Sequence, residues 1–94
     1  MGKSGFYTVM EAPGVTSYVE GLPKDLREAY EHRRRELMID PFPRRGKKTS
    51  WRLRGHWEGY YACAYRGGYR IMYSIDTERR RVYIVDVGPR GDIY

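Results

Sequence analysis

Alternating apolar and polar residues predict β-strands at both ends of this chain. Residues 6–12 (FYTVMEA) have strand composition, and Pro13-Gly14 ends the run. Towards the other end, two similar runs flank Gly67-Gly68, a two-residue hairpin signal. A polar turn (DTERR) then leads into a third run. The pattern predicts an N-terminal strand and a C-terminal antiparallel meander over residues 59–65, 69–75 and 81–88.

The clearest predicted helix lies within residues 22–43. Pro23 suits its first position, and Asp40-Pro41 ends it because the residue before a proline disfavours helical geometry. We interpret the arginines at 33–35 as solvated cations near the negative end of the helix dipole. Residues 15–23 have room for one or two further helical turns. The apolar spacing predicts that one helix face comprises Leu26, Ala29, Tyr30, Arg33 and Leu37.

Helices followed by a hairpin-rich sheet predict an α+β domain with the helices on one sheet face. With Gly67-Gly68 at the hairpin centre, Tyr65 faces Arg70, and Ala62 and Ala64 join the core face. Centring the second turn on Glu78 places Asp86 opposite Arg70. We therefore expect Arg70 on the open face, with Tyr61, Cys63, Tyr65 and Met72 around it. Two interpretations stay open for Arg70, namely a cross-strand pair with Asp86 and a functional cation.

Composition indicates one domain, residues 1–94, in the cytoplasm. No apolar run approaches the roughly 20 residues of a membrane span, and the N-terminus lacks a signal-peptide pattern. The single cysteine, Cys63, excludes an intrachain disulfide and a multi-cysteine metal site, and we expect neither metal nor cofactor. The net charge of +6 and ten tyrosines favour polyanionic partners, either RNA or an acidic protein.

Five short motifs lie in order along nearly the whole chain, namely Leu22-Pro23, Asp40-Pro41, Leu53-x-Gly55, the strand Tyr69 to Tyr73, and the end of the chain from Val87 to Tyr94. Together they resemble the RelE/ParE toxin superfamily of prokaryotic toxin–antitoxin systems. The resemblance implies one strand, two helices and an antiparallel meander. It also implies a cognate antitoxin, which we expect to be short and acidic.

The RelE-like branch of this superfamily consists of ribosome-dependent mRNA endonucleases that inhibit translation. They use the ribose 2′-hydroxyl as nucleophile and need no metal. By resemblance, Arg70 and Arg90 are catalytic residues that bind the scissile phosphate, and Tyr94 orients the RNA. Further RNA contacts are expected from the basic residues Arg44, Arg45, Lys47, Lys48, Arg52 and Arg54, with stacking on Tyr61 and Tyr65.

One departure from the RelE-like pattern leaves the function open. Two lysines of that branch align with Tyr61 and Cys63, and neither residue carries a positive charge. The acid and base are then unassigned among Tyr61, Tyr65, Tyr94, Glu58 and His56. Two alternatives therefore stand beside the nuclease. The first is a ParE-like toxin that poisons DNA gyrase, and the second is a non-enzymatic homologue that acts only in its antitoxin complex.

Overall fold

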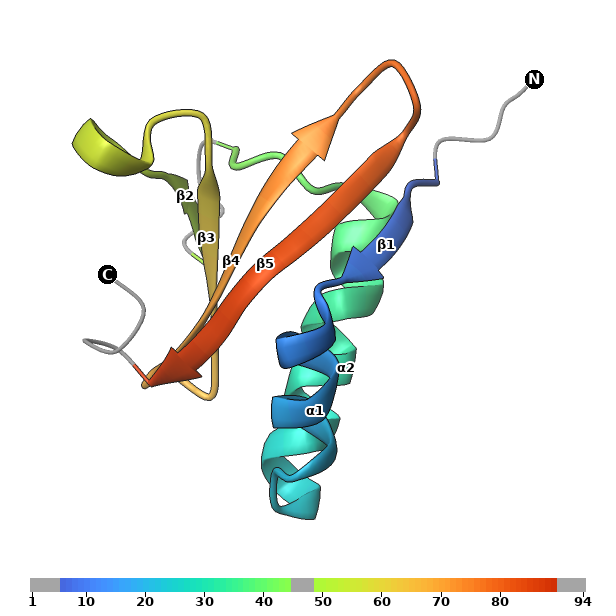
Figure 1. Ribbon diagram of the computed structural model, residues 1–94, viewed down its shortest axis with the longest axis vertical. Helices are drawn as coiled ribbons and strands as arrows, with labels where there is room; N and C mark the ends of the chain where they lie inside the picture. Colours follow the sequence, from blue (N-terminus) through green and yellow to red (C-terminus); the bar gives the residue numbers. More distant parts are fainter. Residues whose placement is uncertain (1–5, 45–48, 90–94) are drawn as a thin grey trace.

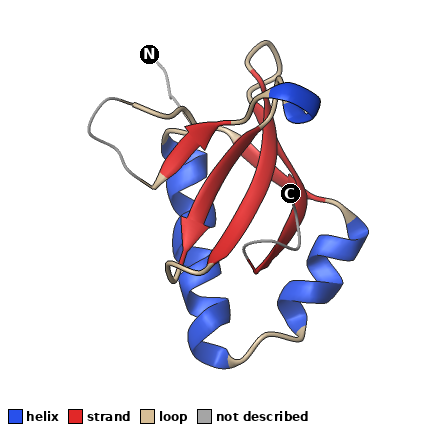
Figure 2. Ribbon diagram, turned by 90° about the vertical axis from the view of Figure 1, so that its left-hand side faces the viewer, coloured by secondary structure: helices blue, strands red, loops and turns tan. Residues whose placement is uncertain are grey.

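The fold is a five-stranded mixed sheet with two helices on one face (Figures 1 and 2). The structure is a computed structural model, which describes residues 6–44 and 49–89. The strand order is β1-β5-β4-β3-β2, with β1 parallel to β5 and the other neighbours antiparallel. This confirms the α+β architecture. The elements are β1 (Thr8–Glu11), α1 (Pro13–Glu20), α2 (Lys24–Ile39), β2 (Ser50–Arg52), the 3-10 helix η1 (Gly55–Trp57), β3 (Tyr61–Tyr65), β4 (Tyr69–Asp76) and β5 (Arg81–Pro89).

Helix α2 forms where the apolar spacing predicts it and packs mainly against β3. Tyr30 and Leu37 are buried on its inner face. The interpretation of the three arginines as solvated cations is wrong for two of them. Arg33 donates from Nε to the Ala64 carbonyl at 2.7 Å, and Arg34 donates from Nη2 to the Val9 carbonyl at 3.0 Å. These arginines therefore tie the helix to strands β3 and β1.

Tyrosines fill much of the core between the helices and the sheet. Tyr30, Tyr65 and Tyr73 are among the largest fully buried side chains. The rings of Tyr30 and Tyr65 meet edge to face at 5.7 Å, an arrangement that aromatic pairs favour. The Tyr73 hydroxyl donates to the Pro41 carbonyl at 2.7 Å, which anchors the segment after α2. Three of the nine tyrosines in the described residues are thus fully buried, and Tyr7, Tyr61 and Tyr69 pack against the same core.

The predicted register of the first hairpin is wrong by one residue. Tyr65 pairs with Tyr69, so the loop contains three residues, 66–68, instead of two. Arg66 and Gly67 adopt positive φ angles of 52° and 69°, which close the loop in this geometry. Because side chains alternate along a strand, this slip turns Tyr61, Cys63 and Tyr65 towards the helices. Ala62 and Ala64 lie on the open face instead.

The second hairpin also departs from the predicted register. Asp76 pairs with Arg81, and an irregularity after Met72 shifts the pairing along β5. Arg70 consequently lies opposite Gly88, while Asp86 lies opposite Met72. The Asp86 carboxylate accepts a hydrogen bond from the backbone N–H of Val87 at 2.9 Å. The cross-strand Arg70–Asp86 pair is therefore not formed.

Candidate nucleic-acid interface

Arg70 lies on the open face of the sheet, as the alternation along β4 predicts. Its strand neighbours Tyr69 and Ile71 face the helix-covered core, whereas Met72 packs in a separate apolar cluster on the open side. The Arg70 guanidinium carbon lies 5.2 Å from the ring centroid of Trp51. A guanidinium at this distance from an indole ring gains cation–π stabilisation. Trp51 therefore restrains the direction in which Arg70 points.

Only part of the hydrogen-bonding capacity of Arg70 is used within residues 6–44 and 49–89. Its Nη1 donates to the carbonyls of Gly67 at 2.8 Å and Tyr69 at 3.1 Å. Its Nε is buried and has no hydrogen-bond partner. No carboxylate in the described residues forms an ion pair with it. A buried donor without a partner costs about 1–3 kcal/mol, so the Nε–Nη2 edge has capacity for an anionic ligand.

Small residues on β3 allow Trp51 to reach Arg70. Trp51 of β2 pairs with Ala62, and Arg70 pairs with Ala64 on the other side of the same strand. Because alanine side chains are short, they project little from the open face of β3. The large indole ring of Trp51 can therefore lie across this strand. The cluster beneath is formed by Leu53, Ala62 and Met72, with Trp51, Trp57 and Tyr60 packed around it.

A groove of about 860 Å³ follows the free edge of β2 next to this cluster. We call it the β2-edge groove. Arg52 lies over the ring of Tyr61, with 6.0 Å between guanidinium carbon and ring centroid. Arg44 forms an ion pair with Asp40, and this hydrogen bond raises the pKa of Arg44. The basic and aromatic residues that line the groove are Arg44, Arg52, Arg54, Trp51, Tyr60 and Tyr61.

Several predicted site residues lie outside the described part of the chain. Strand β5, however, ends at Pro89 with Gly88 directly opposite Arg70. The chain therefore leaves the described region beside Arg70. The residues concerned are Arg45, Lys47, Lys48, Arg90 and Tyr94.

The predicted stacking role of Tyr65 is wrong, because only 1% of its surface is exposed. Burial also raises the pKa of the Tyr65 hydroxyl, which further disfavours its anionic form. Tyr61 is half-buried and its ring stacks on Tyr73 at 5.6 Å. Cys63 is buried. The two positions that align with family lysines, Tyr61 and Cys63, thus face away from Arg70.

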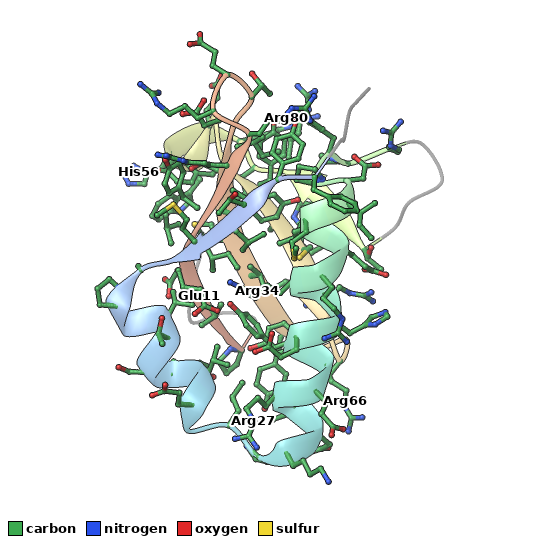
Figure 3. All side chains as sticks on the ribbon, turned by 90° about the vertical axis from the view of Figure 1, so that its right-hand side faces the viewer. Glu11, Arg27, Arg34, His56, Arg66 and Arg80 are labelled. Carbon is green, nitrogen blue, oxygen red and sulfur yellow. The ribbon has the colours of Figure 1, made fainter. Side chains whose placement is uncertain are left out.

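The other candidate acid–base groups lie away from Arg70. His56 and Glu58 are exposed and precede the start of β3, whereas Arg70 pairs with Ala64 near the end of that strand. Figure 3 shows His56 at the opposite end of the sheet from Arg66. Arg66 lies in the same hairpin loop as Gly67, whose carbonyl accepts a hydrogen bond from Arg70. Neither His56 nor Glu58 is placed to exchange a proton at a phosphate on Arg70.

Sequence reasoning missed the contact between Trp51 and Arg70. The two residues lie far apart in sequence and on strands that are not neighbours, so no local pattern signals their contact. The residues that the structure describes contain no group of three or more His, Cys, Asp or Glu side chains that could hold a metal ion. No helix among them is long and apolar enough to cross a membrane.

The chain matches the family model described as ParE toxin of type II toxin-antitoxin system, parDE, over residues 17–94. Among solved structures it is similar to the toxin–antitoxin complex RelBE2 from Mycobacterium tuberculosis. The identity is 26% and the TM-score 0.76, with 92% of this chain and 100% of that chain covered. It is also similar to the archaeal RelE–RelB complex from Pyrococcus horikoshii OT3, with 27% identity, a TM-score of 0.76 and coverage of 94% and 99%.

The isolated Escherichia coli RelE toxin shares the fold, with 23% identity, a TM-score of 0.72 and coverage of 94% of this chain and 90% of that chain. A search of functionally curated proteins gave no match. The family match covers most of the chain. The protein therefore belongs to the RelE/ParE superfamily and is a toxin of a type II toxin–antitoxin system.

Proposed function

We propose that this toxin is a metal-independent, ribosome-dependent mRNA endonuclease that acts in the cytoplasm and inhibits translation. The observation that carries the proposal is the position of Arg70. It lies on the open sheet face beside the end of β5, and the Nε–Nη2 edge has no partner among the described residues. Arginine grips phosphate with two parallel hydrogen bonds, so this edge is matched to a phosphodiester.

In the proposed reaction the ribose 2′-hydroxyl attacks the adjacent phosphorus atom. Its proton goes to a base, the bond from phosphorus to the 5′-oxygen breaks, and the departing oxygen takes a proton from an acid. The products are a 2′,3′-cyclic phosphate and a 5′-hydroxyl. Arg70, with Arg90 shortly after the end of β5, would stabilise the additional negative charge of the crowded phosphate. Fixed donors for developing charge often supply the largest part of catalysis.

Among the described residues, none of the candidate acids and bases is well placed to transfer a proton at a phosphate on Arg70. Tyr65 is buried, Tyr61 is half-buried with its ring stacked on Tyr73, and His56 and Glu58 precede the start of β3. Arg70 remains ionised at neutral pH and does not shuttle protons. We therefore assign Arg70 to phosphate binding alone. Tyr94 is the predicted residue that remains for orienting the RNA and for proton transfer.

Two observations favour a second candidate, a toxin that poisons DNA gyrase. The matching family model is described as ParE toxin. The family lysine positions, Tyr61 and Cys63, also face the core side. A homologue that acts only within its antitoxin complex would share both features. The relatives from M. tuberculosis and P. horikoshii were solved in complexes that are named for toxin and antitoxin together, and we propose a short, acidic antitoxin for this chain.

Induction of the full-length chain without an antitoxin distinguishes these functions. The nuclease proposal predicts new 5′ ends within translated codons, detected by primer extension on abundant messages. It also predicts a loss of translation before any change in DNA supercoiling. Intact messages together with trapped gyrase–DNA complexes would establish the gyrase candidate instead. Normal growth would leave the non-enzymatic homologue.

A further inference from the structure

The β2-edge groove has the composition of a site for single-stranded nucleic acid. It is joined to Arg70 by Trp51, which lines the groove and also stacks against the Arg70 guanidinium. We infer that the groove binds the single-stranded RNA segment that flanks the phosphate held by Arg70. This inference rests on the proposed function, because it treats RNA as the ligand. It groups the expected RNA contacts Arg52 and Arg54 with Trp51 and Tyr60 in one subsite.

The groove carries positive charge that the fold itself does not use. Arg52 and Arg54 are exposed and form no ion pair within the described residues. Elsewhere on the surface, Arg66 is paired with Asp25 at 2.9 Å and Arg79 with Asp76 at 3.1 Å. Glu58 is the acidic residue of the groove lining. The unpaired guanidinium groups are therefore available to the phosphates of a polyanion.

Aromatic rings lie among these cations. Trp51 and Tyr60 are half-buried and line the groove. Tyr60 is held edge to face against Trp57, with 5.8 Å between ring centroids. Rings that are fixed in this way stack on unpaired bases at little entropic cost, whereas the bases of a duplex are already stacked on one another. Cations beside fixed rings thus favour a single strand over a duplex.

The same groove is poorly suited to a peptide that adds a strand to the sheet. Strand β2 comprises only Ser50–Arg52, so a peptide at its free edge would gain few main-chain hydrogen bonds. An acidic side chain could pair with Arg52 or Arg54, but it would not use the ring of Tyr60. A nucleotide uses both features at once, because each residue of RNA supplies one phosphate and one base.

Binding of a short RNA to the full-length toxin tests the inference. The probe is a fluorescent single strand of about ten nucleotides, within the usual range for such grooves, with 2′-O-methyl groups that prevent cleavage. Fluorescence anisotropy is measured at several salt concentrations. The variant Arg52→Ala/Arg54→Ala is expected to bind about tenfold or more weakly, with a salt slope smaller by about 1.4, or 0.7 for each lost contact on a single strand. Tyr60→Leu is expected to weaken binding about tenfold through lost stacking.

A matched control removes the same charge elsewhere. Arg27 and Arg35 on α2 are exposed, form no described ion pair and do not line the groove (Figure 3 labels Arg27). Arg27→Ala/Arg35→Ala should bind RNA within about threefold of the parent. Circular dichroism and thermal unfolding of each variant establish that the fold is retained.

The outcomes separate the groove from the nuclease activity. Equal weakening by the two double variants, or none by either, would overturn the groove assignment even if induced cells show cut messages. If messages in induced cells stay intact but RNA binding is weakened by Arg52→Ala/Arg54→Ala and not by the control, the nuclease proposal would be overturned. The assignment of the groove as an RNA-binding site would then stand. Binding of an acidic polypeptide such as polyglutamate, in place of RNA and lost in Arg52→Ala/Arg54→Ala, would reassign the groove to a protein partner.

Discussion

The polar groups on the two faces of the sheet differ in how completely they are hydrogen-bonded within the fold. On the helix-covered face, Glu11 accepts hydrogen bonds from Tyr30 at 2.5 Å and Thr16 at 2.9 Å and lies 3.4 Å from Arg34 (Figure 3). On the open face, Arg70 has a buried Nε with no described partner. The groups around Glu11 therefore find their hydrogen-bond and ion-pair partners within the fold. Arg70 keeps a donor that has no partner among the described residues.

This difference assigns the two sets of polar residues to different roles. A buried network whose donors and acceptors are paired stabilises one packing of the helices on the sheet. A cation that the fold holds in place but leaves with spare donors is matched to an external anion. Changes on the helix-covered face should therefore act on stability, and changes at Arg70 should act on activity with the fold retained.

The largest expected effect is the loss of mRNA cleavage in Arg70→Ala. Removing one preorganised donor from a site of charge development costs about 100-fold or more in rate. The free energy of unfolding should change by no more than about 1 kcal/mol, because the side chain lies off the main core. Primer extension on induced cells measures cleavage, and thermal unfolding of the purified variant measures stability.

The control for this prediction is Arg66→Ala. Arg66 lies in the same hairpin loop, is exposed and pairs with Asp25. It should retain cleavage. Full cleavage by a folded Arg70→Ala variant would return Arg70 to a structural role and remove the contrast between the two faces.

Glu11→Ala should give the largest loss of stability among these predictions. It leaves the buried hydroxyl of Tyr30 without its acceptor and Arg34 without its ion-pair partner. Lost hydrogen bonds to a charged group, with a buried donor left unpaired, predict a cost of about 3 kcal/mol in the free energy of unfolding. Chemical denaturation measures this cost. Thr16→Ala removes one hydrogen bond of the same network and should cost about 1 kcal/mol; equal losses in the two variants would contradict the central role of Glu11.

Trp51→Leu should reduce cleavage by a smaller factor than Arg70→Ala. The indole ring contributes about 0.5–2 kcal/mol of cation–π stabilisation to the position of Arg70, which corresponds to roughly a tenfold fall in rate at saturating toxin. Single-turnover cleavage of mRNA on programmed ribosomes, measured at several toxin concentrations, separates the rate constant from affinity. Trp57→Leu alters the same apolar cluster without touching Arg70 and should keep the rate constant. A lower rate in both variants would indicate loss of the cluster rather than misplacement of Arg70.

Strand composition and periodicity predicted the elements of this fold well, but not the pairing between strands. The alternation from Tyr69 to Ile75 gave the correct faces of β4, because four large apolar residues mark one side of it and only Met72 lies on the other. In β3, both sides have apolar residues, so the face depends on the loop. Gly67-Gly68 indicated a two-residue loop, whereas the structure extends it to include Arg66. A single residue in loop length decides which side chains meet the helices.

The candidate site was predictable only in part for the same reason. Arg70 was expected on the open face from β4 alone, and this is correct. Its neighbours depended on both registers and were mostly wrong, with Gly88 in place of Asp86 and Ala64 in place of Tyr65. Trp51 reaches Arg70 across an intervening strand. Contacts of this kind depend on the order of the strands in the sheet and on small residues in the strand that lies between. The periodicity of the sequence reveals neither of them.

The smallest expected effect concerns Tyr65, which lies on the helix-covered face but lacks the pairing that is usual there. Its hydroxyl is buried without a hydrogen-bond partner among the described residues, whereas the hydroxyl of Tyr73 donates to Pro41. Tyr65→Phe should therefore leave the free energy of unfolding unchanged or raise it by up to about 1 kcal/mol, while Tyr73→Phe should lower it by about 1 kcal/mol. Cleavage should be unaffected in Tyr65→Phe, because that ring has no exposed surface for RNA. A marked loss of stability in Tyr65→Phe would show that its hydroxyl has an acceptor in solution.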